Sequence, residues 1–130
     1  MKLPNQIEQN FIVLSPDKKA FVETADATLY ERIDKAYQGF KGHELISCYE
    51  FESDWSSWEI HPHGDEVVIL ISGAVTFILQ TESGENCVEL KEQGQYVIVP
   101  QGTWHTAKTP VKSKLLFITP GQDTQHKKSD

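Results

Sequence analysis

The sequence predicts an all-β fold, a sandwich or an antiparallel barrel, with one short helix near its N-terminus. Short apolar runs recur along the chain and are separated by segments rich in Gly, Pro, Ser, Asp and Asn, which favour turns. The runs cover residues 11–14, 45–51, 67–71, 74–79, 88–90, 96–99 and 115–118. Many short strands accompanied by one helix are typical of β-sandwiches and β-barrels.

The helix is expected between residues 24 and 39. Leu29, Ile33 and Tyr37 recur there at helical spacing, and Gly39 follows as a C-terminal cap. The strand before it, residues 11–14, ends at a Ser-Pro-Asp turn. No other segment shows this spacing.

Some predicted strands are apolar on both faces. In residues 67–71, Val67, Ile69 and Ile71 alternate with Val68 and Leu70, which is more than a half-solvated sheet requires. A second sheet, the N-terminal helix or a second copy of the chain can cover the outer face. We expect a homodimer. In the following strand, Val75, Phe77 and Leu79 are expected to face inward and line the wall of a cavity, although the opposite assignment is equally regular.

A chain of 130 residues is long enough for a single core. We expect an N-terminal extension in residues 1–42, with a strand and a helix packed on the barrel, and the barrel itself in residues 43–120. Residues 121–130 contain no apolar side chain and are expected to form a mobile tail. His126 in this tail is therefore a poor candidate for a ligand.

Charge and composition exclude several classes of protein. With 12 Lys and Arg against 19 Asp and Glu, the net charge is −7, which disfavours binding to nucleic acid. Cys48 and Cys87 are far apart and are expected to be free thiols. The longest apolar run, residues 67–71, is too short to cross a membrane, and no signal-length segment is present. We expect a cytoplasmic protein without a membrane partner.

Two segments carry candidate chemistry. In "WEIHPHGDEVVILISG", residues 58–73, His61 and His63 are two residues apart, which on a strand directs both imidazoles to one face. Asp65 or Glu66 can add an oxygen ligand. The alternative is a plain turn around Pro62 and Gly64 with exposed histidines. The second segment, "GQYVIVPQGTWHTAKT", spans residues 94–109 and contains His105.

Together these segments resemble the paired motifs of the cupin superfamily. The second motif is met at Gly94, Pro100, Gly102 and His105, with Thr109 in place of an asparagine. Within the first, His61, His63, Glu66 and Gly73 are present, but Trp55 stands in place of a glycine. In addition, only two residues separate His63 from Glu66, where the family has three or four. The glycines permit positive φ at turns, and Pro100 ends a strand.

The resemblance implies an antiparallel cupin barrel, or jelly roll, with metal ligands at His61, His63, Glu66 and His105. Three imidazoles and one carboxylate suit Fe, Mn, Ni, Cu or Zn. The short spacing leaves the carboxylate open, since Asp65 shares the strand parity of the histidines and is the substitute for Glu66. Gly64 can form a bulge or turn that directs Glu66 inward. A displaced loop with a degenerate site that binds metal weakly or not at all is the third possibility.

Cupins include dioxygenases, isomerases, decarboxylases and non-catalytic binding domains, so the resemblance selects no reaction. The leading hypothesis is a metal-dependent enzyme for a small polar organic molecule, without an assigned catalytic residue. The alternative is a binding or regulatory module with a degenerate site. Neither a nucleophile elbow nor a phosphate-binding loop is present in the sequence. At least two of Trp55, Trp58 and Trp104 are expected in the core or an interface, and Tyr49, Phe51 and Phe117 are expected to serve packing.

Overall fold

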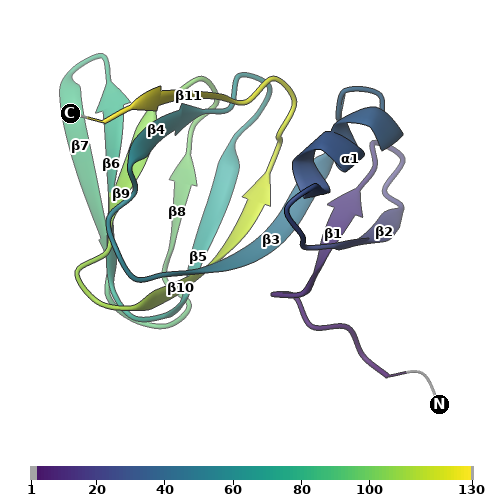
Figure 1. Ribbon diagram of the computed structural model, residues 1–130. Helices are drawn as coiled ribbons and strands as arrows, with labels where there is room; N and C mark the ends of the chain where they lie inside the picture. Colours follow the sequence, from purple (N-terminus) through teal and green to yellow (C-terminus); the bar gives the residue numbers. More distant parts are fainter. Residues whose placement is uncertain (1–2, 130) are drawn as a thin grey trace.

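The computed structural model describes residues 3–129, which form eleven strands and one helix (Figure 1). The elements are β1 (Asn10–Leu14), β2 (Ala20–Thr24), α1 (Leu29–Ala36), β3 (Glu44–Phe51), β4 (Ser57–Ile60), β5 (Glu66–Ser72), β6 (Val75–Thr81), β7 (Gly84–Leu90), β8 (Tyr96–Val99), β9 (His105–Lys108), β10 (Ser113–Thr119) and β11 (Gln125–Lys128). Every predicted apolar run lies within a strand or overlaps one.

The strands form two antiparallel sheets that face each other as a flattened barrel (Figure 1). One sheet has the order β2-β1-β3-β10-β5-β8 and the other has the order β11-β4-β9-β6-β7. Sequence neighbours are often separated in this order, which is characteristic of a jelly roll. The predicted fold class, an antiparallel β-barrel with one short N-terminal helix, is confirmed.

The main core lies between the two sheets. Val68 and Leu70 of β5 are fully buried, and Val75, Phe77 and Leu79 of β6 belong to the same core, so the expected inward side of β6 is confirmed. The turn between these strands requires a glycine: Gly73 has φ of +90°, and a Cβ at this position would collide with Oγ of Ser113.

The N-terminal elements extend the first sheet and add a second, smaller core. β1 pairs with both β2 and β3, so the extension continues the barrel sheet. Helix α1 buries Leu29 and Ile33 against Phe11, Val13 and Leu45. The helix therefore packs on β1 and β3 rather than on the outer face of β5. Within residues 3–129, no helix is long and apolar enough to span a membrane.

Residues 125–128 form strand β11, where the composition predicted a mobile tail. This strand pairs antiparallel with β4 in the register Gln125 to Ile60 and Lys128 to Ser57. All four of its side chains are exposed, so hydrophobic patterning could not reveal it. Main-chain hydrogen bonding to the edge of β4 is enough to place it. Lys127 also lies over the rings of Trp104 and Trp58, at 4.5 Å and 5.9 Å from the ring centres.

Candidate metal centre

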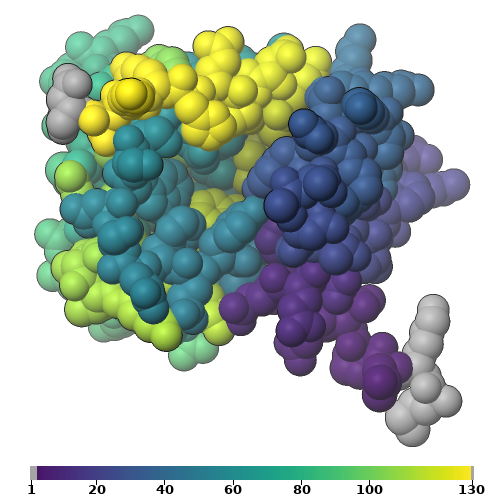
Figure 2. Space-filling view, viewed as in Figure 1, coloured from purple at the N-terminus to yellow at the C-terminus, as the bar shows by residue number. Residues whose placement is uncertain are grey.

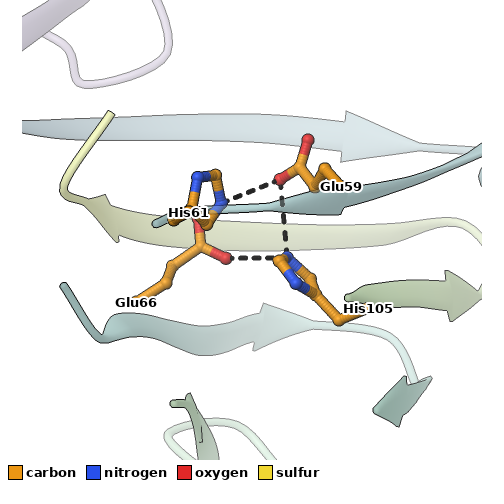
Figure 3. Close-up of side chains that lie close together, drawn as sticks. All are labelled: Glu59, His61, Glu66 and His105. Carbon is orange, nitrogen blue, oxygen red and sulfur yellow. Dashed lines mark ion pairs between the residues drawn. The ribbon is translucent and has the colours of Figure 1, made fainter. Parts of the chain in front are cut away.

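Four side chains from three strands and one turn converge between the two sheets (Figure 3). They are Glu59, His61, Glu66 and His105, and each offers one ligand atom within 4.8 Å of the others. Two carboxylates and two imidazoles form a donor set that divalent transition metals accept.

The sheet pairing explains why these residues meet. Glu59 on β4 lies directly opposite His105 on β9, and cross-strand neighbours on one face have their side chains close together. His61 follows β4 two residues after Glu59, so it projects to the same side. Glu66 is the first residue of β5 and reaches the cluster from the other sheet.

The distances within the cluster match the spacing of ligands around one ion. Nε2 of His61 lies 3.3 Å from oxygens of both Glu59 and Glu66. Nε2 of His105 lies 3.2 Å from Oε1 of Glu66 and 3.6 Å from Oε1 of Glu59. With bonds of about 2.1 Å, neighbouring ligands lie about 3.0 Å apart in octahedral geometry and about 3.4 Å apart in tetrahedral geometry.

The inward-facing atoms of the cluster are buried and have no hydrogen-bond partner. The atoms are Nε2 of His61, Nε2 of His105 and Oε1 of Glu66. They lie close together, but none of them forms a hydrogen bond with another. His105 is 0% exposed, Glu66 is 1% exposed and His61 is 4% exposed. Buried polar atoms are normally hydrogen-bonded, so three such atoms facing one space indicate a site for a bound group.

Hydrogen bonds on the outer side hold both imidazoles in orientation. Nδ1 of His105 donates to the carbonyl oxygen of Thr103 at 3.1 Å. Nδ1 of His61 lies 2.8 Å from Oγ1 of Thr124, and this hydroxyl donates to the carbonyl of Gly121, so its oxygen is free to accept from the imidazole. With Nδ1 protonated in both rings, the Nε2 lone pairs of the neutral imidazoles are directed at the centre of the cluster.

The carboxylates are held as well. Oε2 of Glu66 accepts a hydrogen bond of 2.6 Å from Oγ1 of Thr119. Oε2 of Glu59 lies 3.1 Å from Nε2 of His126 on β11. These contacts leave Oε1 of Glu59 facing both imidazoles and Oε1 of Glu66 facing His105, while Oε2 of Glu66 contacts His61 as well as Thr119.

The charges of the cluster stabilise one another when no cation is bound. Burial alone would lower the pKa of His61 and His105, but the carboxylates of Glu59 and Glu66 outweigh it and raise both pKa values to about 9. Burial alone would raise the pKa of the two glutamates, but the two imidazoles hold these pKa values below the usual range. To bind a cation, His61 and His105 must each release the proton on Nε2.

Three of the predicted ligands, His61, Glu66 and His105, lie in the cluster, and His63 does not. His63 lies in the turn between β4 and β5, where its imidazole is about half exposed and contacts Asp123 at 2.9 Å. Asp65 also faces away and accepts a hydrogen bond from the backbone of Gln101. A turn, rather than a continuous strand, separates His61 from Glu66, so strand parity does not carry across it.

Glu59 was missed by the sequence analysis, although the spacing contained the signal for it. If Glu59 and His61, rather than His61 and His63, take the two alternating positions of the first motif, four residues separate the pair from Glu66. This spacing lies within the family range, and the distance from Glu66 to Gly73 is unchanged. The apparent deletion in the motif was therefore a misplaced first ligand, and the new feature is a carboxylate in the first position.

A cavity of about 970 Å³ opens beside the cluster and includes Glu59, His61 and Glu66 in its wall. Figure 2 shows its mouth as a hollow between the C-terminal segment, β3 and β4, and helix α1. Tyr49, Phe51 and Phe117, expected only to pack, line this cavity together with Trp55. By contrast, Val75, Phe77 and Leu79 belong to the core and lie outside the cavity wall.

Similar solved structures share this architecture. A cupin-2 domain protein from Shewanella frigidimarina matches 59% of this chain and 70% of its own, with 21% identity and a TM-score of 0.51. Hydroquinone 1,2-dioxygenase from Sphingomonas, solved with 4-hydroxybenzoate, matches 58% of both chains with 17% identity and a TM-score of 0.51. A structure of Fe(II)-HppE with a substrate matches 58% of this chain but only 42% of its own, with 12% identity and a TM-score of 0.50.

No protein-family model matches the sequence, and no curated protein does either. The solved structures establish that this chain has the fold of the cupin superfamily. At these identities the likeness concerns the fold alone. The chemistry must therefore be argued from the cluster and the cavity.

Proposed function

We propose that this protein binds one divalent transition metal through Glu59, His61, Glu66 and His105, and acts on a small polar organic molecule in the adjoining cavity. The observation that carries the proposal is the convergence of three buried, unpartnered ligand atoms on one space. Two carboxylates balance the charge of a divalent ion, which lowers the cost of holding it in a buried site.

The donor set suits Fe, Mn, Ni, Cu or Zn, because imidazole nitrogen and carboxylate oxygen together favour metals of intermediate softness. A metal of this kind supplies Lewis acidity or activates oxygen when bound. The chain itself supplies the orientation: Thr103 and Thr124 hold the imidazoles, and Thr119 holds Glu66. Among the proteins of similar fold, HppE has been solved with Fe(II), which is consistent with a metal in such a barrel.

Metal analysis with three alanine variants tests the proposal. The protein is stripped with a chelator, reloaded with each metal in turn, desalted and measured by inductively coupled plasma mass spectrometry. We expect one equivalent of metal in the wild type. His61→Ala and His105→Ala should lose it, because each removes a nitrogen from a four-ligand set.

His63→Ala is the matched control, because this histidine is exposed and lies outside the cluster. It should retain one equivalent of metal. If His63→Ala loses the metal while His61→Ala retains it, our ligand assignment is wrong. If the wild type holds no metal after reloading with any of the candidates, the metal proposal itself fails.

A second candidate function is a non-catalytic binding module with a degenerate site. The observation that favours it is the close pairing of the two imidazoles with the two carboxylates, at 3.2 to 3.6 Å, which lets their charges balance without a metal. The same metal analysis separates the two functions. Metal-free protein that still binds small molecules in the cavity would support the binding module.

We also propose that the protein forms a homodimer through the outer face of β5 and β8. Ile71, Tyr96 and Ile98 on this face are among the exposed large apolar residues, with exposed fractions of 36%, 60% and 51%. Helix α1 packs elsewhere, on β1 and β3. A second copy of the chain is therefore the cover that we favour for this face.

A further inference from the structure

The cavity beside the metal cluster is lined by negative charge. Among the described residues 3–129, eight carboxylates line it and no lysine or arginine does. Glu59 and Glu66 lie at its inner end, within the cluster. The other six lie around it on α1, on β3, on the segment between β3 and β4, and on the C-terminal segment.

Nearby cations balance only part of this charge. Lys112 pairs with Glu50 and Glu52, and Lys108 lies 3.8 Å from Asp54, but neither lysine lines the cavity. A divalent ion in the cluster would balance Glu59 and Glu66.

Two carboxylates of α1 that line the cavity are left unbalanced. Glu31 and Asp34 of α1 form no ion pair within residues 3–129. The cavity therefore keeps a negative potential on its helix side even with a metal bound, and a partly enclosed cleft concentrates such a field.

Aromatic side chains form another part of the cavity wall. Phe51 packs against Trp55 at 5.5 Å between ring centres, and Phe117 packs against both at 6.1 Å. Tyr49 continues the wall at 6.2 Å from Phe51. Trp55 also lies 6.2 Å from the ring of His105, so the wall reaches the cluster. The faces of aromatic rings attract cations and pack against apolar groups.

Buried polar atoms at the inner end show that the cavity is built for a bound group. Oε1 of Glu66, a residue that is 1% exposed, lines the cavity and has no hydrogen-bond partner. The indole nitrogen of Trp55 in the aromatic wall is also buried without a partner. Oε1 of Glu66 belongs to the candidate metal site, whereas the indole N–H of Trp55 is a hydrogen-bond donor and indicates a bound molecule that also carries an acceptor.

We infer that the molecule bound in this cavity is a cation with an aromatic or apolar body, such as an arylalkyl amine, and not a carboxylate or a phosphate. This inference deepens the proposed function, because it names the substrate class of the same site. The aromatic wall contacts the body of the molecule, while Glu31 and Asp34 on the helix side attract its positive charge. An anion of the same size meets the same wall but is repelled by the carboxylates.

The test uses three probes of similar size that differ in charge: 2-phenylethylamine, 2-phenylethanol and phenylacetate. Each is titrated into chelator-treated, metal-free protein by isothermal calorimetry, so that no probe can bind through a metal. We expect the amine to bind at least about tenfold more tightly than phenylacetate, with the alcohol between them. Raising the salt concentration from about 0.05 M to about 0.5 M should weaken the binding of the amine and leave the binding of the alcohol unchanged.

Paired substitutions locate the charge that is responsible. Glu31→Gln with Asp34→Asn should remove most of the preference for the amine. Glu82→Gln with Glu85→Gln changes the net charge equally on exposed residues outside the cavity and should leave the preference intact. Equal or tighter binding of phenylacetate, the same preference in both double variants, or no binding of any probe would each overturn the inference. None of these outcomes bears on metal content, which is measured separately.

Discussion

Glu59 belongs both to the four-residue cluster and to the wall of the cavity. It lies opposite His105 in the sheet, and 21% of its side chain is exposed, whereas Glu66 is almost fully buried. Glu59 also contacts His126 of β11. Of the four proposed ligands, it is therefore the most exposed to a molecule in the cavity, and it would supply half of the negative charge that balances a divalent ion.

Removing that charge while keeping the shape tests the role of Glu59. In Glu59→Gln the cluster retains one carboxylate, and a divalent ion is left with uncompensated positive charge. Zinc affinity, measured by competition with a chromophoric chelator, should fall by more than the roughly 10- to 100-fold that follows loss of an outer hydrogen-bond partner. Asp65→Asn is the matched control, since Asp65 faces away from the cluster. Equal affinities in the two variants would remove Glu59 from the ligand set.

At the level of elements, the C-terminal segment from Gly121 to β11 completes the site. Thr124 contacts His61, Asp123 contacts His63, and His126 contacts Glu59. The segment also pairs with β4, the strand that carries Glu59. It thus braces the site from outside, although none of its side chains belongs to the cluster.

Thr124→Val tests this bracing, because valine keeps the shape of threonine and lacks the hydroxyl that accepts from Nδ1 of His61. Zinc affinity should fall about 10-fold. The pH at which zinc binds most tightly should also change, because the tautomer of His61 is no longer fixed by the hydroxyl. Asp123→Asn alters the neighbouring contact to the exposed His63 and should leave the affinity unchanged. An unaltered affinity in Thr124→Val would mean that sheet pairing alone orients His61.

At the level of the whole molecule, the buried charges make the stability of the metal-free protein depend on pH. The pKa of His61 and His105 rises from 6.5 to about 9 on folding. A raised pKa contributes stability that is complete below pH 6.5 and is lost as the pH rises through about 9. The Tm of chelator-treated protein should therefore fall by at least about 5 °C across this window.

Zinc-loaded protein should show the opposite trend, because protons compete with the metal for the two imidazoles and this competition weakens as the pH rises. The Tm of the metal-free and zinc-loaded forms is compared by differential scanning fluorimetry. No further control is needed, because all other ionisable groups are common to both forms. A Tm of the metal-free protein that is flat or rises between pH 6.5 and about pH 9 would contradict the assigned charges of the cluster.

The outer face of β5 and β8 is the second property of the whole molecule that can be tested. Light scattering after size exclusion should give the mass of a dimer, twice 14.8 kDa. Ile98→Lys should shift the protein to the monomer, because it places a charge on the apolar face. Val111→Lys is the matched control, because it replaces an exposed apolar residue outside this face. Ile12→Lys is unsuitable as a control, because strand β1 is partly buried. If the wild type has the mass of a monomer, the proposed dimer is wrong.

The sequence alone determined the fold class, the helix, the strands with apolar patterns and three of the four residues of the cluster. These are local features: alternation of apolar residues, turn glycines such as Gly73, and histidines at motif spacing act over a few residues and can be read along the chain. Spacing of the same kind favoured Glu66 over Asp65, and Glu66 is the carboxylate that lies in the cluster.

Only the tertiary structure decided what depends on pairing between distant segments. Glu59 joins the cluster because β4 pairs with β9, and β11 exists because its backbone bonds to β4 despite four exposed side chains. His63 leaves the cluster because the chain turns after His61, which ends the alternation of the strand. The identity of the side chains does not specify which strands pair. The hydrogen bonds of a sheet are made by main-chain groups, and every residue except proline has both of these groups.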